Sequence, residues 1–135
     1  MKILTKEITK QLERNYGIQA DLKPVVKLFV CVGGNATWLL TDIDQDGIAF
    51  GLCDLGVGFP ELGYVDVNDL IKTLDWRLER DMHFTADKTL SEYATAARDK
   101  GLREPNQQDA AASGAGWSNH LASPRRSPQP HHHEI

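Results

Sequence analysis

The sequence predicts an α+β domain, with a small antiparallel sheet of about four to five strands and N-terminal, middle and C-terminal helices packed on it. Residues 24–65 alternate between runs of β-branched and aromatic residues and short turns rich in Gly, Asp and Asn. None of these turns has room for a helical crossover, so the strands should be antiparallel. Amphipathic segments flank this region, and we expect the helices to cover one face of the sheet.

The first helix is predicted over residues 5–16. Thr5 is a suitable N-cap, and Glu7 lies in the first turn, where the helix dipole favours an acid. Ile8 and Leu12 form an apolar stripe. Gly17 then supplies a stop signal.

Four strands are expected next, and each is bounded by turn residues. The first begins at Pro24, and the second ends before the DQDG turn at 44–47. Gly56, Gly58 and Pro60 separate the third strand from a shorter fourth one. The expected ranges are 24–32, 36–43, 48–55 and 61–65.

A short helix over residues 67–74 should follow, with Asp66 as N-cap and Asp69 at the third helical position. The charged residues 75–81 predict no particular element. Residues 82–85 resemble one more brief strand. A last helix should run from Thr89 to about Lys100 and end at Gly101.

The domain is expected to span residues 1–102, and residues 103–135 are expected to be disordered. This tail has too few aliphatic side chains to offset the entropy of ordering it. The charged N-terminal segment fits neither a signal peptide nor a membrane span, which predicts a cytoplasmic protein. Cys31 and Cys53 lie in apolar runs and are expected to be buried, reduced thiols.

Charge is unevenly distributed in this chain of net charge −4. No Lys or Arg occurs between Lys27 and Lys72. This composition disfavours direct nucleic-acid binding, which needs positive charge opposite phosphates. It would suit a basic partner or a metal, or simply a solvated acidic face. The acids in this segment are Asp42, Asp44, Asp46, Asp54, Glu61, Asp66 and Asp69.

The stretch TDIDQDG, residues 41–47, resembles the start of a calcium loop because Asp42, Asp44 and Asp46 alternate before Gly47. Such a loop needs a bidentate Glu at position 12, where this chain has Cys53. The flanking segments also look like strands rather than helices. We therefore expect a hairpin turn, with the three aspartates contributing to an acidic surface that binds a cation weakly at most.

Asp54 and Glu61 bracket a Gly-Pro loop, and two carboxylates at one cleft would suit acid–base chemistry or a divalent metal. Trp38, Phe59 and Tyr64 are the aromatic residues that would wall such a pocket. Alternatively, the two carboxylates cap backbone groups around the connection. Their spacing matches no catalytic signature, so we predict no catalytic residue and no cofactor.

Other functional motifs are weak. A cysteine nucleophile would need a nearby base, and His83 is expected on a different strand. The sequence contains no glycine-rich phosphate-binding motif. The mixed charges at 77–83 are typical of a solvated surface, and the histidines at 131–133 lie in the predicted tail.

The run WLLTDIDQDGIAFGLCDLGVGFPELGYVDVNDL at 38–70, followed by ERDMHF at 79–84, resembles the bacterial proteins grouped as domain of unknown function 2958. The opening MKILTKEITKQLERNYG and the later ADKTLSEYATAARDKG are similar to that family as well. The likeness covers about residues 1–102. It departs at 74–78, LDWRL, where a Gly/Pro-containing connection would be expected.

Membership would imply a small bacterial protein, often encoded on plasmids or integrated elements near antirestriction and conjugation genes. It carries over no catalytic residue. We therefore expect a non-enzymatic protein-binding accessory module, with an antirestriction or DNA-mimicking role as its sharper form. The partner would be a protein, including a basic or nucleic-acid-binding one. The alternative is an enzyme or divalent-metal protein that uses Asp54 and Glu61.

Overall fold

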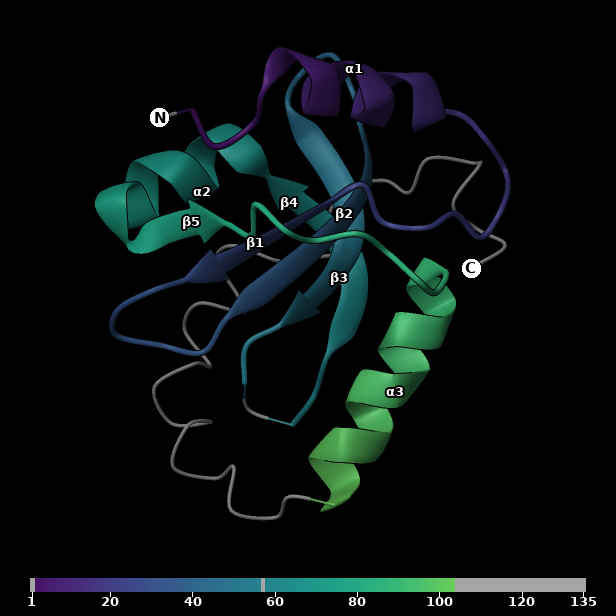
Figure 1. Cartoon of the computed structure of the whole chain (residues 1–135), viewed down its shortest axis with the longest axis vertical. Helices are drawn as coiled ribbons and strands as arrows, with labels where there is room; N and C mark the ends of the chain where they lie inside the picture. The colour runs from purple at the N-terminus through teal and green to yellow at the C-terminus, as the bar shows by residue number, and fades with distance from the viewer. Residues whose placement is uncertain (1, 57, 104–135) are drawn as a thin grey trace.

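The computed structural model of this chain describes residues 2–56 and 58–103 (Figure 1). Its architecture confirms the predicted α+β class, with three helices and one five-stranded sheet. The predicted disordered tail lies outside the described residues, apart from Arg103, which belongs to the last helix. The elements are α1 (Lys6–Asn15), β1 (Val26–Val30), β2 (Thr37–Ile43), β3 (Ile48–Asp54), β4 (Glu61–Asp66), α2 (Val67–Leu74), the 3₁₀ turn η1 (Asp75–Arg77), β5 (Leu78–Arg80) and α3 (Leu90–Arg103).

The sheet is antiparallel throughout, with strand order β4-β3-β2-β1-β5. Strands β1 to β4 form a meander in which each strand pairs with the next along the chain. After β4, helix α2 and η1 lead the chain to the opposite edge of the sheet, where β5 pairs with β1 and Val30 lies opposite Leu78 (Figure 1).

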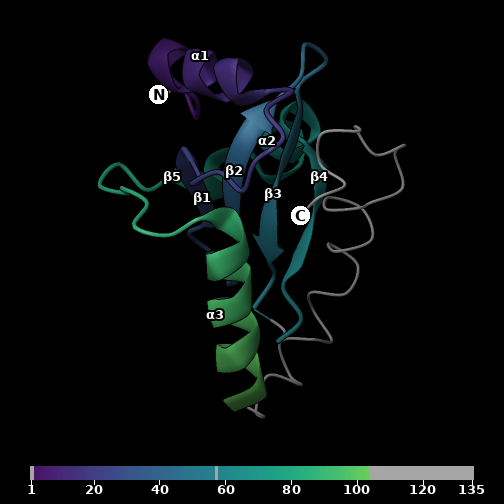
Figure 2. The ribbon, with the colours of Figure 1, turned by 90° about the vertical axis from the view of Figure 1, so that its right-hand side faces the viewer.

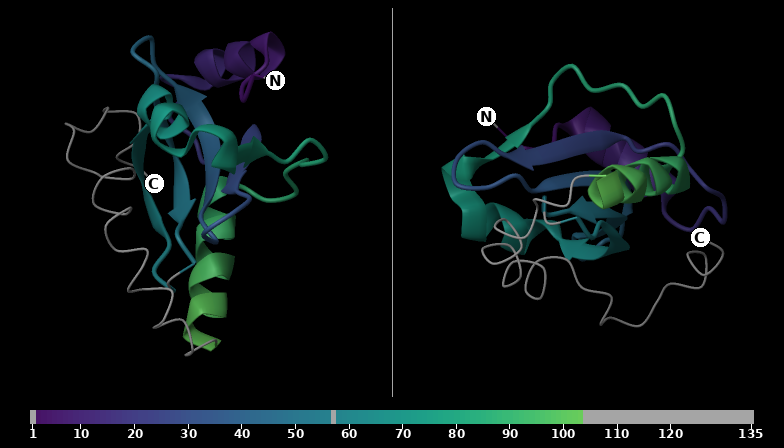
Figure 3. Two further views of the ribbon diagram at one scale, coloured as in Figure 1. Left: turned by 90° about the vertical axis from the view of Figure 1, so that its left-hand side faces the viewer. Right: turned by 90° about the horizontal axis from the view of Figure 1, so that it is seen from below.

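Apolar side chains are buried on both faces of the sheet. One face packs Trp38 and Leu40 against Leu12 of α1 and Leu70 of α2. The other face packs strands β2 and β3, together with Tyr64, against α3; its buried residues are Leu39, Phe50, Leu52, Leu90 and Ala94. Figures 2 and 3 show α2 and α3 on opposite sides of the sheet.

The expectation that all helices cover one face was therefore wrong. The reason lies in the central strand β3, whose residues 48–53 are all buried. A strand with apolar residues on both of its sides needs a cover on each face. Helices α1 and α2 provide one cover and α3 provides the other.

The predicted N-caps of the first two helices, Thr5 and Asp66, are confirmed. The Thr5 hydroxyl accepts a hydrogen bond from the Ile8 amide at 3.1 Å, and the Asp66 carboxylate accepts one from the Asp69 amide at 3.1 Å. The predicted end of the last helix was wrong, because α3 continues through Gly101 to Arg103. A single glycine inside a helix costs only about 1 kcal/mol, so it does not have to end one.

The brief strand predicted at residues 82–85 was also wrong, since β5 lies at Leu78–Arg80. The Asp81 carboxylate accepts a hydrogen bond from the His83 amide at 3.0 Å and turns the chain there. The sequence does not indicate β5 as a strand because one of its inward-facing residues, Arg80, is charged. The Arg80 guanidinium donates to the carbonyl oxygens of Lys2 and Ile3.

Candidate functional site

The acidic stretch at 44–47 is a hairpin turn, as predicted. The Asp44 carboxylate accepts hydrogen bonds from the Asp46 amide at 2.8 Å and the Ile48 amide at 2.9 Å. Gly47 has a φ of +84°, a left-handed conformation that glycine adopts without steric cost. This turn packs against the start of α2, where the Val67 amide donates to the Gly47 carbonyl at 3.0 Å.

Asp42 does not share the exposed surface predicted for the three aspartates. It is 2% exposed, because the register of β2 against β3 shifts between Leu40 and Asp42 and places Asp42 opposite Phe50. Only Asp44 and Asp46 remain at the turn. Within residues 2–56 and 58–103, no three His, Cys, Asp or Glu side chains gather to hold a metal ion.

Asp54 and Glu61 occupy the end of β3 and the start of β4. The Asp54 carboxylate accepts a hydrogen bond from the Gly56 amide at 2.9 Å. Glu61 lies opposite Cys53, the residue before Asp54. Because side chains alternate along a strand, the two carboxylates leave the sheet toward opposite faces. Asp54 thus has the capping role that was the alternative to a site.

The three aromatic candidates lie in different environments. Trp38 is 1% exposed in the core shared with α1 and α2, whereas Tyr64 packs on the α3 side, with its ring centroid 5.1 Å from that of Phe50. Phe59 is 75% exposed. The structure therefore does not bring Trp38, Phe59 and Tyr64 around one pocket.

One end of the sheet exposes three large apolar side chains from three separate segments, Val32, Phe59 and Trp76. We call these residues the loop-end surface. Their exposed fractions are 51%, 75% and 67%. The antiparallel pairing places the β1–β2 loop, the β3–β4 loop and η1 at this same end (Figure 1).

Contacts between neighbouring segments hold this end together. The Cys31 amide donates to the Arg77 carbonyl at 2.8 Å, and the Cys31 thiol donates to the Trp76 carbonyl at 3.8 Å. The β1–β2 and β3–β4 loops meet closely, since a Cβ on Gly56 would lie 2.7 Å from that of Asn35. The loop-end surface was not predicted from the sequence, where its one signal is an apolar residue inside each of three turns.

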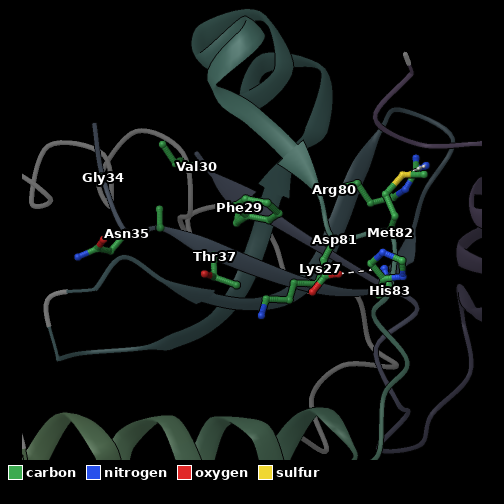
Figure 4. Close-up of a pocket in the computed structure, with 11 residues that line it drawn as sticks. Lys27, Phe29, Val30, Gly34, Asn35, Thr37, Arg80, Asp81, Met82 and His83 are labelled. Atoms are coloured by element: carbon green, nitrogen blue, oxygen red, sulfur yellow. Dashed lines mark hydrogen bonds between the residues drawn. The ribbon is translucent and has the colours of Figure 1, made fainter. Parts of the chain in front are cut away.

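A groove of about 570 Å³ lies on the α3 side of the sheet, over β1 and β2 and beside the segment after β5 (Figure 4). Lys27, Phe29, Val30, Asn35, Thr37 and His83 are among the residues that line it. This groove could not be predicted from the sequence, because it depends on the pairing of β5 with β1.

Comparison with known proteins matches residues 3–102 to the family described as "Protein of unknown function (DUF2958)". The chain belongs to this family. No curated protein and no solved structure gives a match.

The matched segment of this DUF2958 domain begins before α1 and ends within α3. It therefore contains the loop-end surface and every residue named above for the groove. In the part of the chain described by the structure, no helix has the length and apolarity needed to cross a bilayer.

The two cysteines of the DUF2958 domain differ in accessibility. Both are free thiols, but Cys31 is exposed, so the prediction that both are buried holds only for Cys53. Burial, followed by the charges of Asp54 and Glu61, strongly raises the pKa of Cys53. Slight desolvation and the neighbouring Glu79 carboxylate raise the pKa of Cys31.

We expect one thiol per folded chain to react with an aromatic disulfide reagent at pH 8, and the second only after unfolding. Glu79→Gln should speed the Cys31 reaction, because a lower pKa leaves more thiolate at that pH. Absorbance of the released thiol measures both rates, and Glu13→Gln on α1 is the matched control. Simultaneous reaction of both thiols in the folded protein would contradict this assignment.

Proposed function

We propose that this domain is a non-enzymatic protein-binding accessory module that acts in the cytoplasm, serves a mobile element and binds a basic protein through its loop-end surface. The observation that carries the proposal is the exposure of Val32, Phe59 and Trp76 at one end of the sheet. Large apolar side chains exposed together are typical of protein-interaction sites. Trp is also among the residue types most enriched at binding hot spots.

The extent of the loop-end surface favours a protein over a small molecule. Phe59 precedes β4 at one edge of the sheet and Trp76 precedes β5 at the other. Because neighbouring strands lie about 4.8 Å apart, the five strands span roughly 19 Å. A partner that covers this width has the dimensions of a protein interface.

Acidic groups around the loop-end surface give the expected charge of the partner. Glu61 follows Phe59 by two residues and Asp75 directly precedes Trp76, and both acids are exposed. Asp54 is half-buried and follows Cys53, which lies opposite Glu61 in the sheet. Arg77, the nearest cation along the chain, directs its guanidinium at the carbonyl oxygens of Thr73 and Leu74. The loop-end surface, with these acidic neighbours, suits a partner that has apolar side chains flanked by Lys or Arg.

The mobile-element association rests on the family resemblance. A DNA-mimicking antirestriction role would need a row of exposed carboxylates in place of phosphates. Asp42 is buried, and the carboxylates of Asp44, Asp54 and Asp66 accept backbone hydrogen bonds. Contact through the loop-end surface therefore has stronger support than mimicry of DNA, and the opposed directions of Asp54 and Glu61 favour binding over catalysis.

The test is quantitative affinity capture from the native host with wild type, Phe59→Ser and Trp76→Ser. Truncating a central aromatic anchor should weaken capture of the specific partner at least tenfold. Ile18→Ser is the matched control, because Ile18 is also an exposed apolar residue, at 44%, but follows α1 and lies outside the loop-end surface. This change should leave capture unchanged.

Charge is tested separately with Glu61→Lys, and Glu13→Lys on α1 serves as the matched reversal. We expect Glu61→Lys to reduce capture and Glu13→Lys to leave it intact. The proposal fails if no captured protein depends on Phe59 or Trp76. The basic character of the partner fails if both reversals behave alike.

A further inference from the structure

The groove beside the last strand has the size and mixture of groups of a small-molecule site. Its volume of about 570 Å³ falls within the range of ligand pockets in proteins. Phe29 provides apolar surface, while Asn35 and Thr37 provide an amide and a hydroxyl (Figure 4). Helix α3 packs over β2 and β3 and leaves this part of the sheet open.

Strand alternation explains why the groove contains these groups. On β1, Val26 and Leu28 enter the core shared with α1 and α2, so Lys27 and Phe29 are on the opposite face. Thr37 lies directly opposite Phe29 on β2. The short segment after β5 adds His83, and the Asp81 amide donates to the Lys27 carbonyl at 2.9 Å, which fixes this segment against β1.

The charge of the groove differs from that of the surrounding chain. Lys27 is the last cation before a 44-residue stretch without Lys or Arg, residues 28–71, and its ammonium makes no ion pair within the described residues. Arg80 lies opposite Leu28, so its side chain is on the α1 face of the sheet, where its guanidinium donates to the carbonyl oxygens of Lys2 and Ile3 and to the Met82 sulfur.

One acid, Asp81, lines the same end of the groove. Its carboxylate is engaged by the His83 amide at 3.0 Å. The Lys27 ammonium is the cation available to a ligand on this face of the sheet, and His83 adds a further donor. Lys27 and the aromatic ring of Phe29 thus lie on the same face of β1 and line the same groove (Figure 4).

We infer that this groove binds a small organic anion with an aromatic body, whose anionic group pairs with Lys27 and whose ring packs on Phe29. Asn35 and Thr37 would orient polar substituents on the ligand. This inference does not depend on the loop-end surface or on its protein partner.

Phenyl phosphate is the probe, because it joins an aromatic ring to an anion. In a titration of the full chain followed by amide NMR, it should bind in about the millimolar range, which is typical of a ligand of this size. Shifts should concentrate at Phe29, Gly34, Thr37 and His83. Inorganic phosphate and benzyl alcohol, which carry only one half of the probe, should each bind about tenfold more weakly or not at all.

Two groove variants and one control decide the assignment. Lys27→Gln should weaken phenyl phosphate binding by about fivefold and leave benzyl alcohol unaffected. Phe29→Leu should weaken binding of both aromatic compounds, and retained amide dispersion would show that each variant is folded. Lys72→Gln removes an exposed charge on α2 and should change nothing.

The inference is overturned by any of three results. The first is the absence of shifts at the groove amides at tens of millimolar phenyl phosphate. The second is equal affinity of wild type and Lys27→Gln. The third is binding of benzylamine, the cationic counterpart, as tight as that of phenyl phosphate.

Discussion

Gly51→Ala is expected to destabilise the domain by about 3 kcal/mol or more, or to prevent folding. A Cβ at this position would lie 1.9 Å from the Leu39 carbonyl oxygen and 2.9 Å from the Leu40 Cα. Both obstacles are backbone atoms of the neighbouring central strand, so no side chain can rotate away. The sheet itself would have to separate.

Strand β2 approaches Gly51 closely where its register with β3 changes, between Leu40 and Asp42. A β-bulge of this kind bends and twists the strand locally. Glycine is therefore required here for space, since the backbone of Gly51 does not have positive φ.

Urea unfolding followed by circular dichroism measures the effect, with Gly34→Ala as the matched control. At Gly34 the closest obstacle is a methyl carbon of Val30 at 3.8 Å, which is ordinary contact, so the change should stay within about 0.5 kcal/mol. Equal free energies of unfolding for the two variants would show that β2 and β3 can move apart at little cost.

Trp38→Ala is expected to cost about 3–5 kcal/mol of unfolding free energy. Trp38 is 1% exposed and lies between Leu28 on β1 and Cys53 on β3, in the core under α1 and α2. Its removal would leave a cavity that the rigid sheet cannot close.

Trp38→Phe should cost less than about 2 kcal/mol, because it keeps most of the apolar contact. The Trp38 indole N–H is buried without a conventional hydrogen-bond acceptor among the described residues, so its loss removes little. The indole N–H interacts with the Cys53 thiol and lowers the pKa of that thiol, but burial raises the same pKa by more.

The same urea titration compares the two Trp38 variants. A loss for Trp38→Phe as large as that for Trp38→Ala would mean that the indole N–H, rather than its apolar surface, stabilises this core.

Features set by chemistry within a few residues were predictable from the sequence. Thr5 and Asp66 cap their helices through their own side chains, and Asp44 with Gly47 forms the hairpin turn. In each case the residue type alone indicates which hydrogen bond or backbone angle the residue provides. The antiparallel meander followed from the short connections.

Features set by distant pairing were not predictable in this way. The burial of Asp42 depends on a register shift, and the placement of α3 depends on which face of β3 it covers. The exposed Trp76 and the groove at Lys27 both require β5 to pair with β1. No local pattern in a charged segment such as 75–81 indicates that pairing.

The strand order β4-β3-β2-β1-β5 has a consequence for the kinetics of folding. The β1–β4 meander is built from hairpins between strands that are neighbours in the chain, which close quickly. The pairing of Leu28 with Arg80 instead closes a loop of 51 intervening residues, which carries a larger entropic cost. The meander is therefore the natural folding nucleus, and the groove is completed late, when β5 docks on β1.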